Sequence, residues 1–130
     1  MHEPYFATVL LSPAICMAEI FKNSLAEEGF ESFQKKGFCV NHNKASEMTI
    51  HYTLYEELEC HLIDSLGEFD EKIHIYHGVL DDVAPFQDSK TFAEKNPNTT
   101  LIPLENEKHS YTEEGLNKLC EAVITYLLEQ

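Results

Sequence analysis

Two short segments of this 130-residue chain carry side chains that can transfer protons. The first reads His77-Gly-Val-Leu-Asp81-Asp82, and the second reads Glu105-Asn-Glu-Lys-His109. An aspartate that orients a histidine, with the histidine as general base, forms two thirds of a nucleophilic triad. We therefore take Asp81 and His109 as candidate catalytic residues. Without further context, the two aspartates are more typical of an ordinary turn than of a catalytic site. His109 would then be a surface histidine that precedes a helix.

Three short strands are predicted to position these segments. The apolar run 6–11 is typical of a strand that is buried on both faces in a parallel sheet. Residues 72–77 predict a second strand, which ends at Gly78. Residues 100–104 predict a third strand at or near a sheet edge, because Pro103 has no backbone N–H to donate. In a parallel sheet the loops after these strands lie at one edge, where catalytic groups are commonly found.

Two helices follow these strands. One is predicted over about 86–95, after Pro85, and the Asn-Pro-Asn sequence of 96–98 must stop it. The other begins after Thr112, a natural N-cap. Its apolar residues follow helical spacing: Leu116, Leu119, Cys120, Val123, Ile124, Leu127 and Leu128. The alternation predicts an α/β fold with three layers, in which helices flank a parallel sheet of about three core strands.

Residues 14–70 differ from the rest in their sequence pattern, because acidic and aromatic residues are mixed there. Met48, Tyr52, Tyr55, Leu58 and Leu62 have helical spacing, so we expect two or more helices in this segment. A short strand over 37–40 and a turn over 41–43 are expected between them. The segment is thus a mainly helical insert.

The order strand, H-G-x-x-D-x-x-x-P, helix, strand, loop histidine and final helix resembles the C-terminal half of an α/β-hydrolase. Residues 7–13 are similar to the strand that follows the nucleophile helix in that family. The resemblance implies one partial α/β-hydrolase domain over residues 1–130. Within it, 14–70 would be a cap-like or lid-like insert, and 72–130 would bear the triad acid Asp81 and the triad base His109. Spacing from Gly78 favours Asp81 over Asp82.

The nucleophile of the family is missing from this sequence. None of its five glycines completes a G-x-S-x-G elbow. The segment around Ser65 comes nearest to this motif, but it lacks the first glycine, so we do not expect Ser65 to be the nucleophile. The family's oxyanion-hole loop is missing as well. The resemblance therefore implies the C-terminal portion of a serine hydrolase for carboxylic esters or related small acyl substrates, inactive as this chain alone.

A second hypothesis is a non-catalytic domain derived from the same fold. If no strand precedes 6–11, the backbone groups of that edge are unpaired and form a template for association. We therefore expect a homo-oligomer through strand 6–11, or pairing of this strand with a missing N-terminal half.

Composition excludes other classes. The chain has 9 lysines, no arginine and 23 acidic residues, and its charge of −14 argues against nucleic acid as a partner. No apolar run approaches the ~18 residues of a membrane span.

The four cysteines are scattered, so we expect free, mostly buried thiols and a cytoplasmic location. His74 and His77 are more typical of core residues, or of groups that support a catalytic residue, than of metal ligands, and we expect no cofactor or metal.

Overall fold

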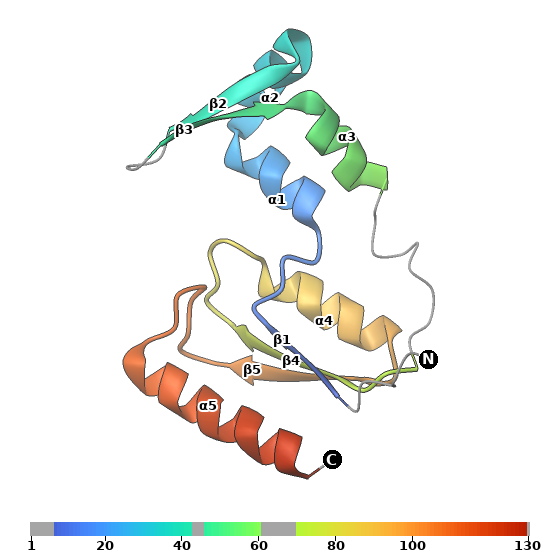
Figure 1. Ribbon diagram of the computed structural model, residues 1–130, viewed down its shortest axis with the longest axis vertical. Helices are drawn as coiled ribbons and strands as arrows, with labels where there is room; N and C mark the ends of the chain where they lie inside the picture. The colour runs from blue at the N-terminus through green and yellow to red at the C-terminus, as the bar shows by residue number, and fades with distance from the viewer. Residues whose placement is uncertain (1–6, 43–45, 61–69, 130) are drawn as a thin grey trace. The chain divides into compact units, whose positions relative to one another are not determined.

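The computed structural model describes residues 7–42, 46–60 and 70–129. The chain divides into two compact units, which we treat separately (Figure 1). The sheet unit consists of residues 1–15 and 67–130, and the inserted unit consists of residues 16–66. The inserted unit lies close to the expected boundaries 14–70. Its role as a cap stays a prediction.

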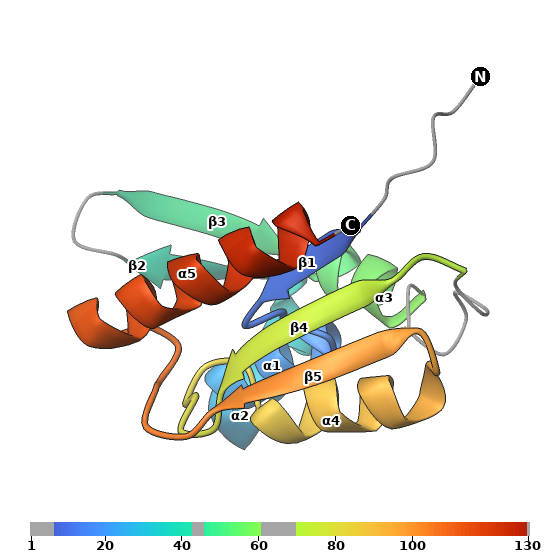
Figure 2. The ribbon, with the colours of Figure 1, turned by 90° about the horizontal axis from the view of Figure 1, so that it is seen from below.

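A three-stranded parallel sheet forms the centre of the sheet unit. Its strands are β1 (Thr8–Leu11), β4 (Ile73–Gly78) and β5 (Thr99–Leu104), in the order β1-β4-β5 (Figure 2). All three predicted strands are thus confirmed. β5 lies at one edge of this sheet, as its proline predicts. Because the strands are parallel, their carboxyl ends lie at the same edge.

Two helices cover the two faces of this sheet, which confirms the three-layer α/β arrangement (Figure 1). They are α4 (Phe86–Lys95) and α5 (Glu113–Leu128), within a residue or two of the predicted bounds. Successive side chains of β4 point to opposite faces. His77 contacts Ser89 of α4, whereas His74 stacks on Tyr126 of α5 with ring centroids 3.5 Å apart.

Burial of β1 and α5 is lower than the sequence predicts. β1 is only partly buried and Leu11 is 50% exposed, so the expected burial on both faces is wrong for this chain. β4 pairs with one edge of β1, and no other described strand pairs with its second edge. α5 buries Leu119 and Tyr126. Five residues of the predicted apolar stripe are exposed: Leu116, Cys120, Ile124, Leu127 and Leu128.

The four thiols are free, but the prediction that they are mostly buried is wrong. Cys60 and Cys120 are exposed, and Cys16 and Cys39 are partly buried. Cys120 adjoins the buried Leu119 in sequence, and one residue rotates a helix side chain by about 100°. Since α5 buries only the side that faces the sheet, Cys120 lies outside that side.

The described part of the inserted unit contains three helices, which confirms the expected two or more, together with a two-stranded antiparallel sheet. Its elements are α1 (Met17–Ser24), α2 (Ala26–Lys36), β2 (Phe38–His42), β3 (Glu47–His51) and α3 (Tyr52–Cys60). The strand predicted over 37–40 is confirmed, but it runs on through two residues of the expected turn. The predicted helix over Met48 is wrong, because β3 pairs antiparallel with β2 there. Leu62 and Ser65 lie outside the described residues.

Aromatic side chains fill the centre of the inserted unit. Phe33 is 1% exposed, and its ring meets those of Phe21, Phe30 and Tyr52 edge-on. Edge-to-face packing of this kind is the favoured geometry of aromatic pairs. Gly37 ends α2 at φ 79°, a left-handed conformation that glycine adopts without strain. This core consists of residues of the inserted unit alone.

Among the described residues, no helix has both the length and the apolar character that crossing a bilayer requires.

Candidate active site

Asp81 lies in the loop that directly follows β4, and its side chain is fully buried. Its Oδ1 atom accepts the backbone N–H groups of Val83 and Ala84, at 2.9 and 2.8 Å. This is the hydrogen-bonded turn that aspartate commonly forms with its own loop. Its Oδ2 atom lies 2.9 Å from Nδ1 of His109. The turn therefore fixes the carboxylate with one oxygen presented to the histidine.

Asp81 is held as a carboxylate. Burial works against its ionisation and would raise its pKa. The N–H groups of Val83 and Ala84, together with the hydrogen bond and charge of His109, outweigh burial and hold the pKa of Asp81 below its usual value. A charged acceptor is what an orienting acid requires.

His109 lies in the loop after β5, 28 residues from Asp81. Because a carboxylate oxygen can only accept, the Nδ1 atom of His109 carries the proton of their hydrogen bond. The imidazole is 40% exposed, and its Nε2 atom has no hydrogen-bond partner among the described residues. The structure thus brings Asp81 and His109 together in the arrangement of a triad acid and base. Their catalytic roles stay a prediction.

Asp82 lies apart from this pair. Its side chain is exposed, and its carboxylate is 3.8 Å from Nζ of Lys108. Such an exposed ion pair contributes little to stability. Asp81 is therefore the aspartate of this pair that contacts His109.

Gly78 allows the two loops to approach. A Cβ atom at this position would lie 2.8 Å from the carbonyl oxygen of Lys108 and closer still to that of Glu107. Two backbone hydrogen bonds of 3.0 Å join the loops there: Val79 N–H donates to Leu104, and Leu80 N–H donates to Glu107. A side chain at Gly78 would therefore separate the loop of Asp81 from the loop of His109.

Glu107 joins the His109 loop to the start of α5. Its side chain accepts from the backbone N–H of Thr112 at 2.6 Å and from the Thr112 hydroxyl at 2.7 Å. The Thr112 oxygen in turn accepts the N–H of Gly115, which confirms Thr112 as the N-cap. Gly115 has no side chain to displace the Glu107 carboxylate, which contacts its backbone. A buried acid at this end of a helix also suits the helix dipole.

Tyr111 joins the same loop to β1. Its hydroxyl is 2.7 Å from Oγ of Ser12, which directly follows β1. Ser12 is buried, and its φ of 41° is unusual for a residue other than glycine. Burial raises the pKa of Tyr111 and outweighs the opposite effect of the Ser12 hydrogen bond. The tyrosine is therefore a neutral link between β1 and the histidine loop.

Sequence reasoning left His77 as either a core residue or a group that supports a catalytic residue, and it missed Ser89. His77 Nε2 lies 3.1 Å from Asp81 Oδ2, and its Nδ1 lies 2.7 Å from Ser89 Oγ. The alternation of Ile73, Ile75 and His77 was the available signal, because a histidine on an apolar strand face needs polar partners.

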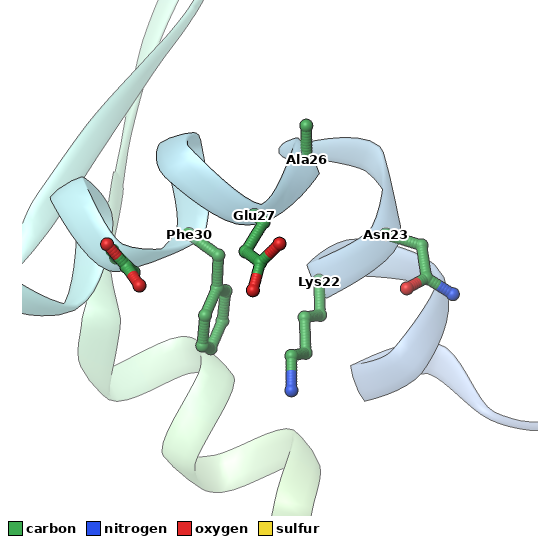
Figure 3. Close-up of a pocket in the computed structure, with 6 residues that line it drawn as sticks. Lys22, Asn23, Ala26, Glu27 and Phe30 are labelled. Carbon is green, nitrogen blue, oxygen red and sulfur yellow. The ribbon is translucent and has the colours of Figure 1, made fainter.

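Among the described residues, no group of three or more His, Cys, Asp or Glu side chains is arranged to hold a metal ion. A groove of about 430 Å³ lies instead in the inserted unit, along α1 and α2 (Figure 3). Lys22 lies over the ring of Phe30 there, with Nζ 5.1 Å from its centroid. Neither Asp81 nor His109 lines this groove.

The fold of this chain is similar to that of several solved hydrolases. The chain is similar to Est1E from Butyrivibrio proteoclasticus, solved with ferulic acid bound, at a TM-score of 0.77 and 21% identity. It is similar to alpha/beta hydrolase domain-containing protein 10 from mouse, at a TM-score of 0.73 and 18% identity. This chain has part of an α/β-hydrolase fold.

The partial α/β-hydrolase fold spans about half of each solved hydrolase. The match covers 96% of this chain and 49% of Est1E, and 95% of this chain and 52% of the mouse protein. A putative hydrolase from Agrobacterium vitis matches over 96% of this chain and 52% of its own, with a TM-score of 0.74 and 15% identity. No family model and no curated protein matches the chain.

Proposed function

We propose that this chain is the acid-bearing and base-bearing portion of a serine hydrolase that acts on carboxylic esters or related acyl substrates. One observation carries the proposal. The buried Asp81 carboxylate accepts from Nδ1 of His109, while Nε2 of the same ring is left without a partner among the described residues. This is the tautomer that a general base uses.

In the proposed reaction, His109 Nε2 takes the proton of a serine hydroxyl as that oxygen attacks the acyl carbon. It then gives this proton to the departing alkoxide oxygen. Asp81 stabilises the imidazolium between these two steps.

The serine and the oxyanion donors belong to another segment, since the sequence has no G-x-S-x-G elbow. The free cysteines support a reducing, cytoplasmic location.

Labelling with a fluorophosphonate, read by intact mass, tests this function. The chain alone should form no stable adduct, because no serine of it is activated. A chimaera that adds the unmatched part of Est1E should label at one serine. The labelling rate of the chimaera should fall at least about 100-fold in the His109→Gln and Asp81→Asn variants. Labelling of a folded His109→Gln chimaera at the unchanged rate would reject the base role of His109.

The alternative is a non-catalytic domain that associates through β1. The N–H groups of Thr8 and Ser12 donate to Lys72 and Tyr76 on the β4 side. Since N–H directions alternate along a strand, those of Val9 and Leu11 point to the open edge. An open strand edge is a template for pairing, and we propose a homodimer through β1 when no other half covers it.

A proline at the open edge separates this alternative from simple hydrophobic clustering. Val9→Pro removes an outward N–H and leaves the bonds to β4 in place, so sedimentation should show loss of the dimer. Val9→Ala keeps the N–H and is the matched control, which should still form dimers. A dimer of unchanged affinity in Val9→Pro, or a monomer in the unaltered chain at high concentration, would reject pairing through β1.

A further inference from the structure

We propose that His77 is a positioning residue of this site, which fixes the Asp81 carboxylate and shares its Oδ2 atom with His109. The catalytic meaning of this inference rests on the proposed function, whereas the hydrogen-bond network itself does not. Four groups form the network: the buried side chains of Ser89, His77 and Asp81, and the ring of His109, which is 40% exposed.

The partners of His77 determine its tautomer. Its Nε2 atom lies 3.1 Å from Asp81 Oδ2 and 2.9 Å from the carbonyl oxygen of Ala84. Both partners can only accept, so Nε2 must carry a proton. Its Nδ1 atom lies 2.7 Å from Ser89 Oγ, and a serine hydroxyl can donate to it. The neutral imidazole with its proton on Nε2 therefore satisfies both ring nitrogens.

Burial makes this arrangement rigid. His77 and Ser89 are both 0% exposed, so water cannot replace either partner. The ring of Phe86 meets the His77 ring edge-on, at 5.8 Å and 89°. The other tautomer would direct a lone pair of Nε2 at two acceptors, which is costly in a buried site. The two acceptors at Nε2 thus select the tautomer that donates to Asp81, and the Ser89 hydroxyl satisfies Nδ1 by donating to it.

His77 therefore contacts both ends of the Asp81 turn. Ala84 donates its N–H to Oδ1 of Asp81, while its carbonyl oxygen accepts from His77. The same His77 proton also faces Oδ2 of Asp81, the oxygen that His109 uses. Since two N–H groups donate to one oxygen, each hydrogen bond weakens the other. The hydrogen bond from His77 thereby limits the strength of the hydrogen bond from His109 Nδ1 to Asp81.

Other charged groups near the site do not contact His77. Lys108 pairs with Asp82, and Glu107 is engaged by Thr112. Tyr111 bonds to Ser12. Within the described residues, only His77, His109 and two backbone N–H groups donate to Asp81. A change in the His109 hydrogen bond on substitution of His77 is therefore attributable to Oδ2 of Asp81.

Two isosteric substitutions test the proposal by proton NMR of the His109 Nδ1–H. In His77→Gln, the amide nitrogen replaces Nε2 and keeps a donor to Asp81, so the His109 resonance should stay in place. In His77→Asn, the shorter amide reaches Ser89 but leaves Oδ2 to His109 alone. Its hydrogen bond should strengthen, and the resonance should move to lower field. Equal behaviour of the two folded variants would overturn the proposal.

The unaltered chain provides a second measurement that needs no variant. Nitrogen-15 NMR of the His77 ring should show Nε2 protonated and Nδ1 unprotonated, and Ser89→Ala should change the Nδ1 shift. A neutral ring protonated on Nδ1 would overturn the proposal even if both substitutions prevented folding. These resonances are independent of turnover. A network without fluorophosphonate labelling in the chimaera would reject the proposed function and leave the inference standing.

Discussion

At the residue scale, the strength of the site lies in the number of donors that converge on one carboxylate. Asp81 accepts two backbone N–H groups on Oδ1 and two imidazole N–H groups on Oδ2. Hydrogen bonds to a charged acceptor contribute about 1.5–3 kcal/mol each. The sequence favoured Asp81 and His109 because the H-G-x-x-D segment and the later loop histidine resemble those of α/β-hydrolases. It could not identify Ser89, since a serine in a helix has no distinctive spacing.

Replacement of Asp81 by Asn should lower the free energy of unfolding by about 3 kcal/mol at pH 7. The Asn oxygen can still accept from Val83 and Ala84, but its NH₂ group then faces two ring N–H donors. Urea denaturation measures the difference. As a matched control, Asp82→Asn should change the free energy by less than about 0.5 kcal/mol, because that carboxylate is exposed.

The same pair of proteins should show a definite pH dependence. The folded pKa of Asp81 is lowered, so its charge stabilises the folded state above the unfolded pKa of about 3.9. This contribution is lost as the pH falls through the folded pKa. The difference in unfolding free energy between the unaltered protein and Asp81→Asn should therefore be full at pH 5 and smaller at pH 3. A difference that grows on acidification would contradict the lowered pKa.

At the element scale, the site depends on loops that meet at the carboxyl ends of β4 and β5. Gly78 permits the approach, and Glu107 fastens one loop to the first turn of α5. The glycine after β4 and the Thr112 cap could be predicted, because both positions have local signals. The closing role of Glu107 could not, since it depends on which atoms approach across the fold.

A methyl group at Gly78 should separate these loops. Gly78→Ala places a Cβ atom against the backbone of Glu107 and Lys108, where only the main chain can move. We expect a loss of about 2–3 kcal/mol in unfolding free energy and loss of the His109 Nδ1–H resonance. Gly29→Ala is the control, because its Cβ atom would meet ordinary contact at 3.6 Å in α2. That variant should be as stable as the original or up to about 1 kcal/mol more so.

Removal of the α5 cap should have a smaller effect than the Gly78 change. Thr112→Ala leaves the Gly115 N–H and one Glu107 oxygen without their partner. The expected loss is about 1–2 kcal/mol, measured by thermal or urea unfolding. Thr125→Ala removes an exposed hydroxyl that bonds only to a carbonyl of its own helix. An equal loss of unfolding free energy in both variants would show that the cap stabilises the protein no more than an ordinary exposed hydroxyl does.

The inserted unit shows where local pattern fails. Met48 has helical spacing from Tyr52, yet it lies in β3. The pairing of Cys39 with Ile50 places both beside the aromatic core, and this contact outweighs the local preference. The short run between Gly37 and Tyr52 offers too few residues for periodicity to decide between helix and strand.

At the scale of the whole molecule, an apolar surface is left open on α5. Leu116, Ile124, Leu127 and Leu128 are 48 to 82% exposed, although their spacing is that of a buried stripe. The sequence predicted the stripe but not its exposure. Periodicity shows which residues share one face of a helix, but it does not show whether another element covers that face. The solved hydrolases are about twice as long as the part matched here.

Charge on this open surface should therefore leave folding intact. Ile124→Lys is expected to change the unfolding free energy by less than about 0.5 kcal/mol. Leu119→Ala, on the buried side of the same helix, should lower it by about 2–4 kcal/mol. Urea denaturation of both variants measures the contrast. A large loss in Ile124→Lys would show that this side chain is covered in solution.

The place of the inserted unit in the chain limits how this protein can be shortened. β1 and β4 are neighbours and run in the same direction, so the chain must travel back along the sheet between them. A tight hairpin cannot make that return. Residues 16–66 occupy the only stretch that joins the two strands, so the unit serves as their crossover connection. An engineer who deletes it must supply a return path of about a dozen residues in its place.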